Sequence, residues 1–187
     1  AQAGEGPPPT FNELYESIPM TVNGDYTPIF GLGCEEGAEA DALPFIFWYA
    51  PGAAADPLWH ITSIDPFAYT STPVPANGPS EPLLGDFDGD LCDDILWYGP
   101  GGAPDSIWWG ETGLDFTPAP VTINGTFDPV VGYFGEDDLI DIFWYAPGTA
   151  TEHMWEGKED RTFSSAVGPA VNGQYEIESL GASILFH

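Results

Sequence analysis

Four aspartates with alternating spacing form the part of the sequence best suited to chemistry. They occupy positions 1, 3, 5 and 9 of a loop that runs from residue 86 to residue 94, with Gly89 between them. Calcium binds roughly six to eight oxygens at about 2.3–2.6 Å, so only a tightly curled loop brings alternate carboxylates to one centre. Glycine permits such a curl because it has no side chain. The pattern predicts a Ca²⁺ site formed by Asp86, Asp88, Asp90, the main-chain carbonyl of Cys92, and Asp94. A plain acidic turn is the alternative interpretation.

Motifs for catalysis are absent from the sequence. It contains no GxSxG motif and no HExxH motif, and its three histidines are isolated from one another. The two cysteines lack CxxC spacing, so a zinc site has little support. Paired carboxylates are frequent because the whole chain is acidic, so they do not indicate glycosidase chemistry. We therefore expect no enzymatic activity; an enzyme acting on glycans is the alternative.

The charge balance of the 187-residue chain is one-sided. It has 30 acidic residues and two basic ones, Lys158 and Arg161, which gives a formal net charge of -28. Such a chain repels nucleic acid and anionic membranes and attracts divalent cations. Hydrophobic residues make up 43% and aromatic residues 14% of the chain, which is more than a disordered chain carries. Because of this charge we expect no nucleic acid partner. No apolar run has the length of a membrane span, so we also expect no membrane insertion.

Several sequence markers repeat with a period of about 48 residues. An apolar strand that contains Trp-Tyr and ends in a Pro-Gly turn occurs at 45–52, 95–101 and 142–148. In each copy a second tryptophan follows the first by 11 residues, and an acidic residue precedes that second tryptophan by three. Asn-Gly pairs, which favour tight turns, begin at residues 23, 77, 124 and 172. Markers that share one period indicate a repeat architecture.

Each repeat has room for four short strands. In the second repeat we expect strands at 82–87, 94–98, 106–110 and 115–123, and the prolines of the last one suit an edge strand. The 94–98 strand is apolar on both faces, so other sheets must cover both sides. Glycine and proline occur throughout the chain and exclude long helices. The sequence therefore predicts an all-β fold, a β-propeller of about four four-stranded blades.

The last repeat is short, so the sequence leaves the closure of the ring open. We predict a Pro-rich arm at 1–10 and a single propeller domain at 11–187. The repeats cover approximately residues 23–76, 77–123, 124–171 and 172–187, and residues 11–22 have the pattern of an isolated strand. Either this N-terminal strand or a neighbouring chain would complete the last blade.

The second repeat resembles the FG-GAP/VCBS repeat family. The likeness is carried by Gly-Asp-Phe-Asp-Gly-Asp at 85–90 and Asp-Asp-Ile-Leu-Trp-Tyr at 93–98, and the strand and turn markers extend it over about residues 21–187. The resemblance implies a propeller like those of integrin α heads and some fungal lectins, with calcium in the blade loops. The third repeat departs from the family pattern, since Tyr133 and Gly135 replace two aspartates. The first loop is longer, so metal binding in the first and third repeats stays open. The fourth loop is shorter, and we expect it to bind no metal.

The two cysteines lie in equivalent loops of adjacent repeats. Because neighbouring blades place such loops side by side, we predict a Cys34–Cys92 disulfide if the protein is secreted. Two separate buried thiols are the alternative.

Tryptophans and one asparagine are the candidates for surface recognition. Trp108 and Trp109 are neighbours on one strand, and strand alternation points them to opposite faces, so one of the pair could be an exposed platform for a sugar or an assembly contact. Asn124 begins a glycosylation sequon, although its place at a repeat joint favours a structural role. These features predict a secreted, extracellular, calcium-stabilised propeller that binds a glycan or a protein. The alternative is a structural subunit of an extracellular homo-oligomer or filament, joined through complementary terminal strands.

Overall fold

The computed structural model describes residues 19–35, 42–52, 56–76 and 78–187. In this part of the chain every helix-or-strand element is a β-strand. The strands form three four-stranded antiparallel sheets and one two-stranded sheet. The all-β prediction is confirmed, and each sheet takes its strands from one predicted repeat in sequence order.

The first sheet contains β1 (Thr27–Gly33), β2 (Leu43–Tyr49), β3 (Pro57–Ile64) and β4 (Phe67–Pro73). The second contains β5 (Glu81–Gly85), β6 (Asp94–Tyr98), β7 (Asp105–Glu111) and β8 (Asp115–Val121). The third contains β9 (Asp128–Gly132), β10 (Asp141–Tyr145), β11 (His153–Lys158) and β12 (Thr162–Val167). The fourth contains β13 (Ile177–Ser179) and β14 (Ile184–Phe186).

The second strands of the three four-stranded sheets lie in the core. All residues of β6 and β10 are buried, because sheets on both sides cover them. Ile95 and Trp97 face the first sheet and join a hydrophobic cluster with residues of β2. Leu96 and Tyr98 face the third sheet and pack with residues of β10. In contrast, β8 is the outer strand of its sheet, where Pro118 and its neighbours need no further pairing partner.

A tyrosine at the end of the second strand joins each of the first three sheets to the segment that follows it. The Tyr98 hydroxyl accepts the N–H of Phe127 at 2.8 Å and donates to the carbonyl of Gly125 at 3.3 Å. Tyr49 and Tyr145 make the same pair of bonds to the segments that follow their own sheets. The Asn-Gly joints are therefore fixed by the preceding sheet as well as by their own turn.

The acidic residue that precedes each second tryptophan is a hydrogen-bond acceptor, and it is buried in the first and third sheets. Asp56, which is 1% exposed, accepts the N–H groups of Ala50 at 2.7 Å and Ala76 at 3.0 Å. Asp105 makes the equivalent bonds in the second sheet, and Glu152 accepts a bond from the end of the third repeat. These acids clamp the turn before the third strand to the end of the repeat, which explains their regular spacing.

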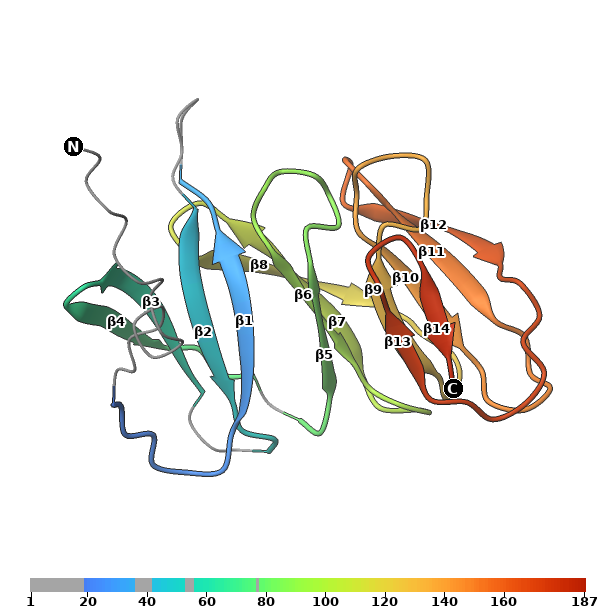
Figure 1. Ribbon diagram of the computed structural model, residues 1–187, viewed down its shortest axis with the longest axis horizontal. Coiled ribbons are helices and arrows are strands. Elements are labelled where there is room, and N and C mark those ends of the chain that lie inside the picture. Colours follow the sequence, from blue (N-terminus) through green and yellow to red (C-terminus); the bar gives the residue numbers. More distant parts are fainter. Residues whose placement is uncertain (1–18, 36–41, 53–55, 77) are drawn as a thin grey trace, which may run out of the picture.

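The four sheets follow one another across the molecule in sequence order (Figure 1). Strand β1 contacts β5, β5 contacts β9, and β9 contacts β13, so the first strands lie side by side. The last predicted blade is incomplete in the described part of the chain, where its sheet contains only β13 and β14. Most of the predicted 11–22 strand lies outside the described residues, and residues 19–22 form no strand. Over the described ranges there is no helix with the length and apolarity needed to cross a membrane.

Candidate metal centre

The β5–β6 loop is folded by its own carboxylates. Asp86 accepts hydrogen bonds from the N–H groups of Gly89 at 2.7 Å and Leu91 at 3.0 Å. Asp88 accepts one from the N–H of Asp90 at 3.2 Å. Gly89 and Leu91 have φ angles of 78° and 71°, the left-handed conformation that this tight curl requires. The loop therefore curls around its own aspartates, which is a condition for the predicted metal site.

Asp94 attaches the loop to the body of the second sheet. Its buried carboxylate accepts the N–H of Phe87 at 2.9 Å and the N–H of Gly110, on β7, at 2.7 Å. Asp141 makes the equivalent bonds in the third sheet, to its own loop and to Gly157 on β11. Because the third loop lacks two of the other aspartates, this carboxylate has a structural role that does not depend on a metal.

Three of the four predicted carboxylate ligands converge. Asp86, Asp88 and Asp94 each offer an oxygen, and these oxygens lie within 4.8 Å of one another. A point therefore exists no more than about 2.8 Å from all three, close to the Ca–O distance of about 2.3–2.6 Å. Carboxylate oxygens are also the ligands that Ca²⁺ prefers, so the donor set fits this ion with a small contraction.

Asp90 and Cys92 are not part of this converging group. An oxygen of Asp90 approaches the sulfur atoms of Cys34 and Cys92 within 4.8 Å, and its Oδ1 accepts the N–H of Cys92 at 2.9 Å. These sulfurs form a disulfide and are not metal ligands. The Asp90 carboxylate and the Cys92 carbonyl thus remain predicted ligands, outside the group that the fold brings together.

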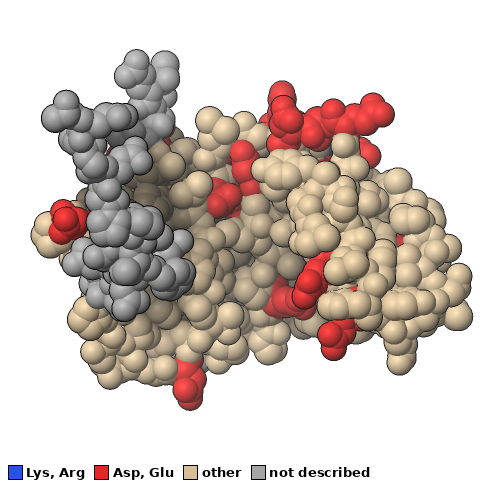
Figure 2. All heavy atoms as spheres, in the orientation of Figure 1, with Lys and Arg blue, Asp and Glu red and all other residues tan. Residues whose placement is uncertain are grey.

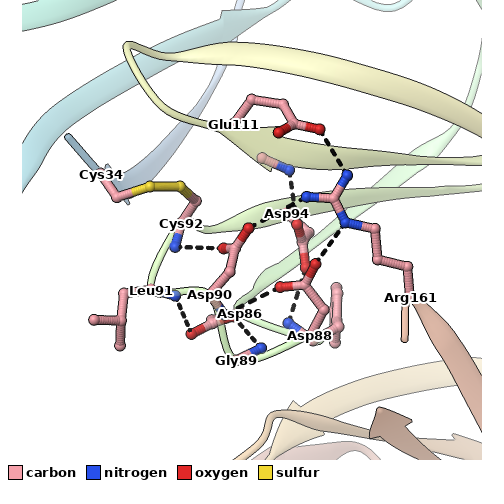
Figure 3. A network of polar contacts seen from close by, with 12 residues as sticks. Cys34, Asp86, Asp88, Gly89, Asp90, Leu91, Cys92, Asp94, Glu111 and Arg161 are labelled. Atoms are coloured by element: carbon pink, nitrogen blue, oxygen red, sulfur yellow. Dashed lines mark hydrogen bonds and ion pairs between the residues drawn. A yellow bond between two sulfur atoms is a disulfide. The ribbon is translucent and has the colours of Figure 1, made fainter. Parts of the chain in front are cut away.

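Arg161 is the cation that contacts this loop, and sequence reasoning did not identify it. From the β11–β12 turn of the third sheet, its Nε donates to Oδ2 of Asp88 at 2.8 Å (Figure 3). Its Nη2 lies 3.3 Å from Oδ2 of Asp90, and its Nη1 lies 2.6 Å from Oε1 of Glu111. The signal in the sequence was the scarcity of basic residues, since a lone arginine in so acidic a chain must lie near carboxylates.

Burial raises the pKa of several carboxylates of this loop, Asp94 most of all. It raises the pKa of Asp94 to about 8, although hydrogen bonds from Gly110 and Phe87 act in the opposite direction. It also raises the pKa of Asp86 and of Asp90, and the charge of Asp90 adds to the effect at Asp86. A bound cation would offset the cost of holding these charges away from water.

The predicted disulfide between the first and second sheets is confirmed. Cys34 follows β1 and Cys92 lies in the β5–β6 loop, with their Cα atoms 4.9 Å apart. Both residues are buried, and two main-chain hydrogen bonds lie close by, from Asp93 to Leu32 and from Gly113 to Cys34. The bond therefore anchors the candidate loop to the neighbouring sheet.

An acidic hollow borders the candidate loop. It has a volume of about 700 Å³ and lies between the β5–β6 and β9–β10 loops, where its acidic lining residues are Asp86, Asp137, Asp138, Glu159 and Asp160. Figure 2 shows acidic side chains in several groups on one face of the molecule. Lys158, at the end of β11, lies 3.9 Å from Asp137 of the β9–β10 loop, so part of this negative charge is paired.

The tryptophan pair and the sequon have different surroundings. Trp108 and Trp109 do face opposite sides of the second sheet, but Trp109 is only 4% exposed and stacks on Phe163 of β12. Trp108 is half-buried and packs edge-on against Trp97, so neither forms an exposed platform. The third sheet covers Trp109, whereas Trp108 packs on residues of its own sheet, so a ligand contact at this pair stays a prediction. Asn124 is exposed and lines a pocket between the second and third sheets.

No family model, curated protein or solved structure matches the chain. Functional inference for this protein therefore rests on its own residues and their contacts.

Proposed function

We propose that the chain is a secreted β-propeller module, stabilised by Ca²⁺, that binds a glycan or a protein without catalysing a reaction. The observation that carries the proposal is the convergence of Asp86, Asp88 and Asp94 in one curled loop. When bound, Ca²⁺ would supply positive charge that neutralises buried carboxylates. The role of the chain is to hold these oxygens in place through main-chain hydrogen bonds.

The propeller arrangement is supported by the repeated contacts between successive sheets. First strands contact first strands from β1 to β13, and each buried second strand is covered on both faces. Radial packing of four-stranded sheets has these properties. Secretion is supported by the disulfide, since such bonds persist in oxidising compartments.

Calcium binding is tested by thermal unfolding of the metal-free protein with added Ca²⁺. Wild-type protein should gain stability with rising concentration, by about 2.7 kcal/mol when free Ca²⁺ exceeds its dissociation constant a hundredfold. Asp88→Asn should abolish this gain, because it removes a charged oxygen from the converging group. Asp137→Asn is the matched control, since it neutralises an aspartate of the neighbouring β9–β10 loop. A midpoint that ignores Ca²⁺, or a full gain in Asp88→Asn, would contradict the calcium site.

A ligand pocket is available between the second and third sheets. It has a volume of about 310 Å³ and combines aromatic with polar groups, among them Phe127, Trp144, His153, Trp155 and Asn124. Aromatic faces next to hydrogen-bonding groups suit a sugar ring. Binding to a glycan array in Ca²⁺, followed by Trp155→Ala, tests this version; no binding to any sugar argues for a protein ligand instead.

An assembly subunit is the second candidate function. The outer face of the first sheet carries an apolar groove of about 700 Å³, lined by residues that include Phe30, Leu32 and Ile64. Phe30 is 65% and Ile64 is 73% exposed within the described part of the chain. By strand register, Phe30 corresponds to Leu84, which packs in the cluster between the first and second sheets. Light scattering after size exclusion tests the candidate: a strict monomer excludes it, and an oligomer that Phe30→Ser dissociates supports it.

A further inference from the structure

Arg161 connects the third sheet to the candidate calcium loop of the second. It lies in the turn between β11 and β12 and has a φ angle of 62°, a backbone conformation that residues other than glycine rarely adopt. Its guanidinium holds Oδ2 of Asp88 and Oδ2 of Asp90, while Nη1 holds Glu111 (Figure 3). Asp88 has a side-chain exposure of 3%, so this ion pair is shielded from solvent on one side.

The corresponding residue one repeat earlier has the same backbone but a different chemistry. Leu114 precedes Arg161 by 47 residues, lies in the β7–β8 turn and has a φ angle of 64°. It also reaches the preceding sheet, where a Cβ atom added to Gly33 would collide with it. The same turn position thus carries leucine beside the loop without alternating aspartates, and arginine beside the loop that has them.

The guanidinium engages the oxygens that the loop does not use for its own folding. Oδ1 of Asp88 accepts the N–H of Asp90, and Oδ1 of Asp90 accepts the N–H of Cys92. The two Oδ2 atoms are left for a cation, and both point to Arg161. A divalent ion at the converging carboxylates would use Asp88, which Arg161 also holds, and would repel a guanidinium a few ångströms away.

We propose that Arg161 is an internal competitor of Ca²⁺ at this loop. The loop is then either clamped to the third sheet through Arg161 or loaded with Ca²⁺, and Glu111 retains the guanidinium in the loaded state. This inference rests on the calcium binding proposed above, and it adds that the ion and the link between sheets exclude one another. The arginine sets a threshold for calcium: it lowers the affinity of the loop and keeps the metal-free loop folded.

The test is calorimetric titration of Ca²⁺ into wild-type, Arg161→Gln and Lys158→Gln protein. Arg161→Gln should bind Ca²⁺ roughly tenfold more tightly, since two charge-assisted hydrogen bonds no longer compete. Lys158→Gln is the matched control: it removes the same charge from the same hairpin, but Lys158 contacts Glu156 and Asp137 rather than the loop. Its affinity should stay at the wild-type value. Arg161→Lys keeps the charge but lacks the planar guanidinium, so its Ca²⁺ affinity should lie between those of the wild type and Arg161→Gln.

The outcomes separate the two proposals. Wild-type protein that binds Ca²⁺ with unchanged or weaker binding in Arg161→Gln overturns the competition and leaves the calcium site intact. Absence of binding in every variant overturns the calcium site and the competition together. Binding by Arg161→Gln alone supports the competition and shows that arginine has replaced the metal in the wild type. Far-ultraviolet circular dichroism shows whether Arg161→Gln is folded. If it is not, the Ca²⁺ affinity of Arg161→Lys tests the competition: tighter binding than in the wild type supports it, and equal or weaker binding overturns it.

Discussion

The hydroxyl of Tyr98 accepts a hydrogen bond from the backbone N–H of Phe127 at 2.8 Å, across the joint between the second and third sheets. Tyr98→Phe removes only the hydroxyl group and leaves the N–H of Phe127 without this acceptor. We expect a loss of about 1–3 kcal/mol in the free energy of unfolding, the usual cost of an unpaired buried group. Urea denaturation measures it, and Tyr133→Phe, at an exposed tyrosine, is the control. Equal stability of both variants would contradict the role of this bond.

Removal of the disulfide should destabilise the protein strongly. Cys34 and Cys92 are 58 residues apart, so the bond restricts a long segment of the unfolded chain. We expect the Cys34→Ser/Cys92→Ser double variant to lose about 2–4 kcal/mol of unfolding free energy. Reductant should have the same effect on the wild type and none on the double variant. A wild type that reductant leaves unchanged would show that the bond contributes little.

The metal-free protein should lose stability as pH rises. Burial raises the pKa of Asp94 to about 8 in the folded state, from a value near 3.8 in the unfolded chain. Between these values the folded protein binds more protons than the unfolded protein, so the free energy of unfolding decreases with rising pH. The stabilisation is complete below about pH 4 and is lost through about pH 8.

Melting of metal-free protein at about pH 5 and about pH 8 measures this dependence. Asp86 and Asp90, whose pKa burial also raises, act in the same direction. Asp94→Asn cannot ionise and should flatten the slope. With saturating Ca²⁺ the slope should weaken, since the ion selects the ionised carboxylates. A metal-free midpoint that increases over this pH range would refute the assigned sign.

Gly110 should tolerate no side chain. A Cβ atom there would lie 2.6 Å from the main-chain oxygen of Asp93 and 2.9 Å from the Cβ of Cys92, so the candidate loop would have to move. We expect Gly110→Ala to cost about 1–3 kcal/mol in unfolding free energy and to weaken Ca²⁺ binding. Gly102→Ala is the control, because nothing lies within 4 Å of its added Cβ. Chemical denaturation compares the unfolding free energies of the two variants. An unchanged value for Gly110→Ala would contradict the prediction and show that the loop can move without loss of stability.

The sequence predicted what depends on local pattern. The period fixed the strands, since the predicted 94–98 strand is β6 and the predicted 115–123 strand corresponds to β8. Equivalent loops in adjacent repeats led to the Cys34–Cys92 bond. The contact between Arg161 and Asp88 could not be predicted, because it depends on how two sheets stack and joins residues 73 positions apart. The burial of Trp109 could not be predicted for the same reason: strand alternation gives the direction of a side chain but not what covers it, here Phe163 of β12.

The three boundaries between sheets are fastened unequally, which gives the protein a direction of unfolding. A covalent bond joins the first and second sheets, and the ion pairs of Arg161 join the second and third. The fourth sheet has the Tyr145 bonds that the other joints also have, a main-chain bond from Tyr133 to Gly181 and aromatic contacts of Phe186, but neither a disulfide nor an ion pair to the third sheet among the described residues. None of its strand residues is buried. In a linear series of units, stability follows the weakest boundary. Amide hydrogens of β13 and β14 should therefore exchange first, and the chain should open from its C-terminal end while the disulfide-bonded sheets stay closed.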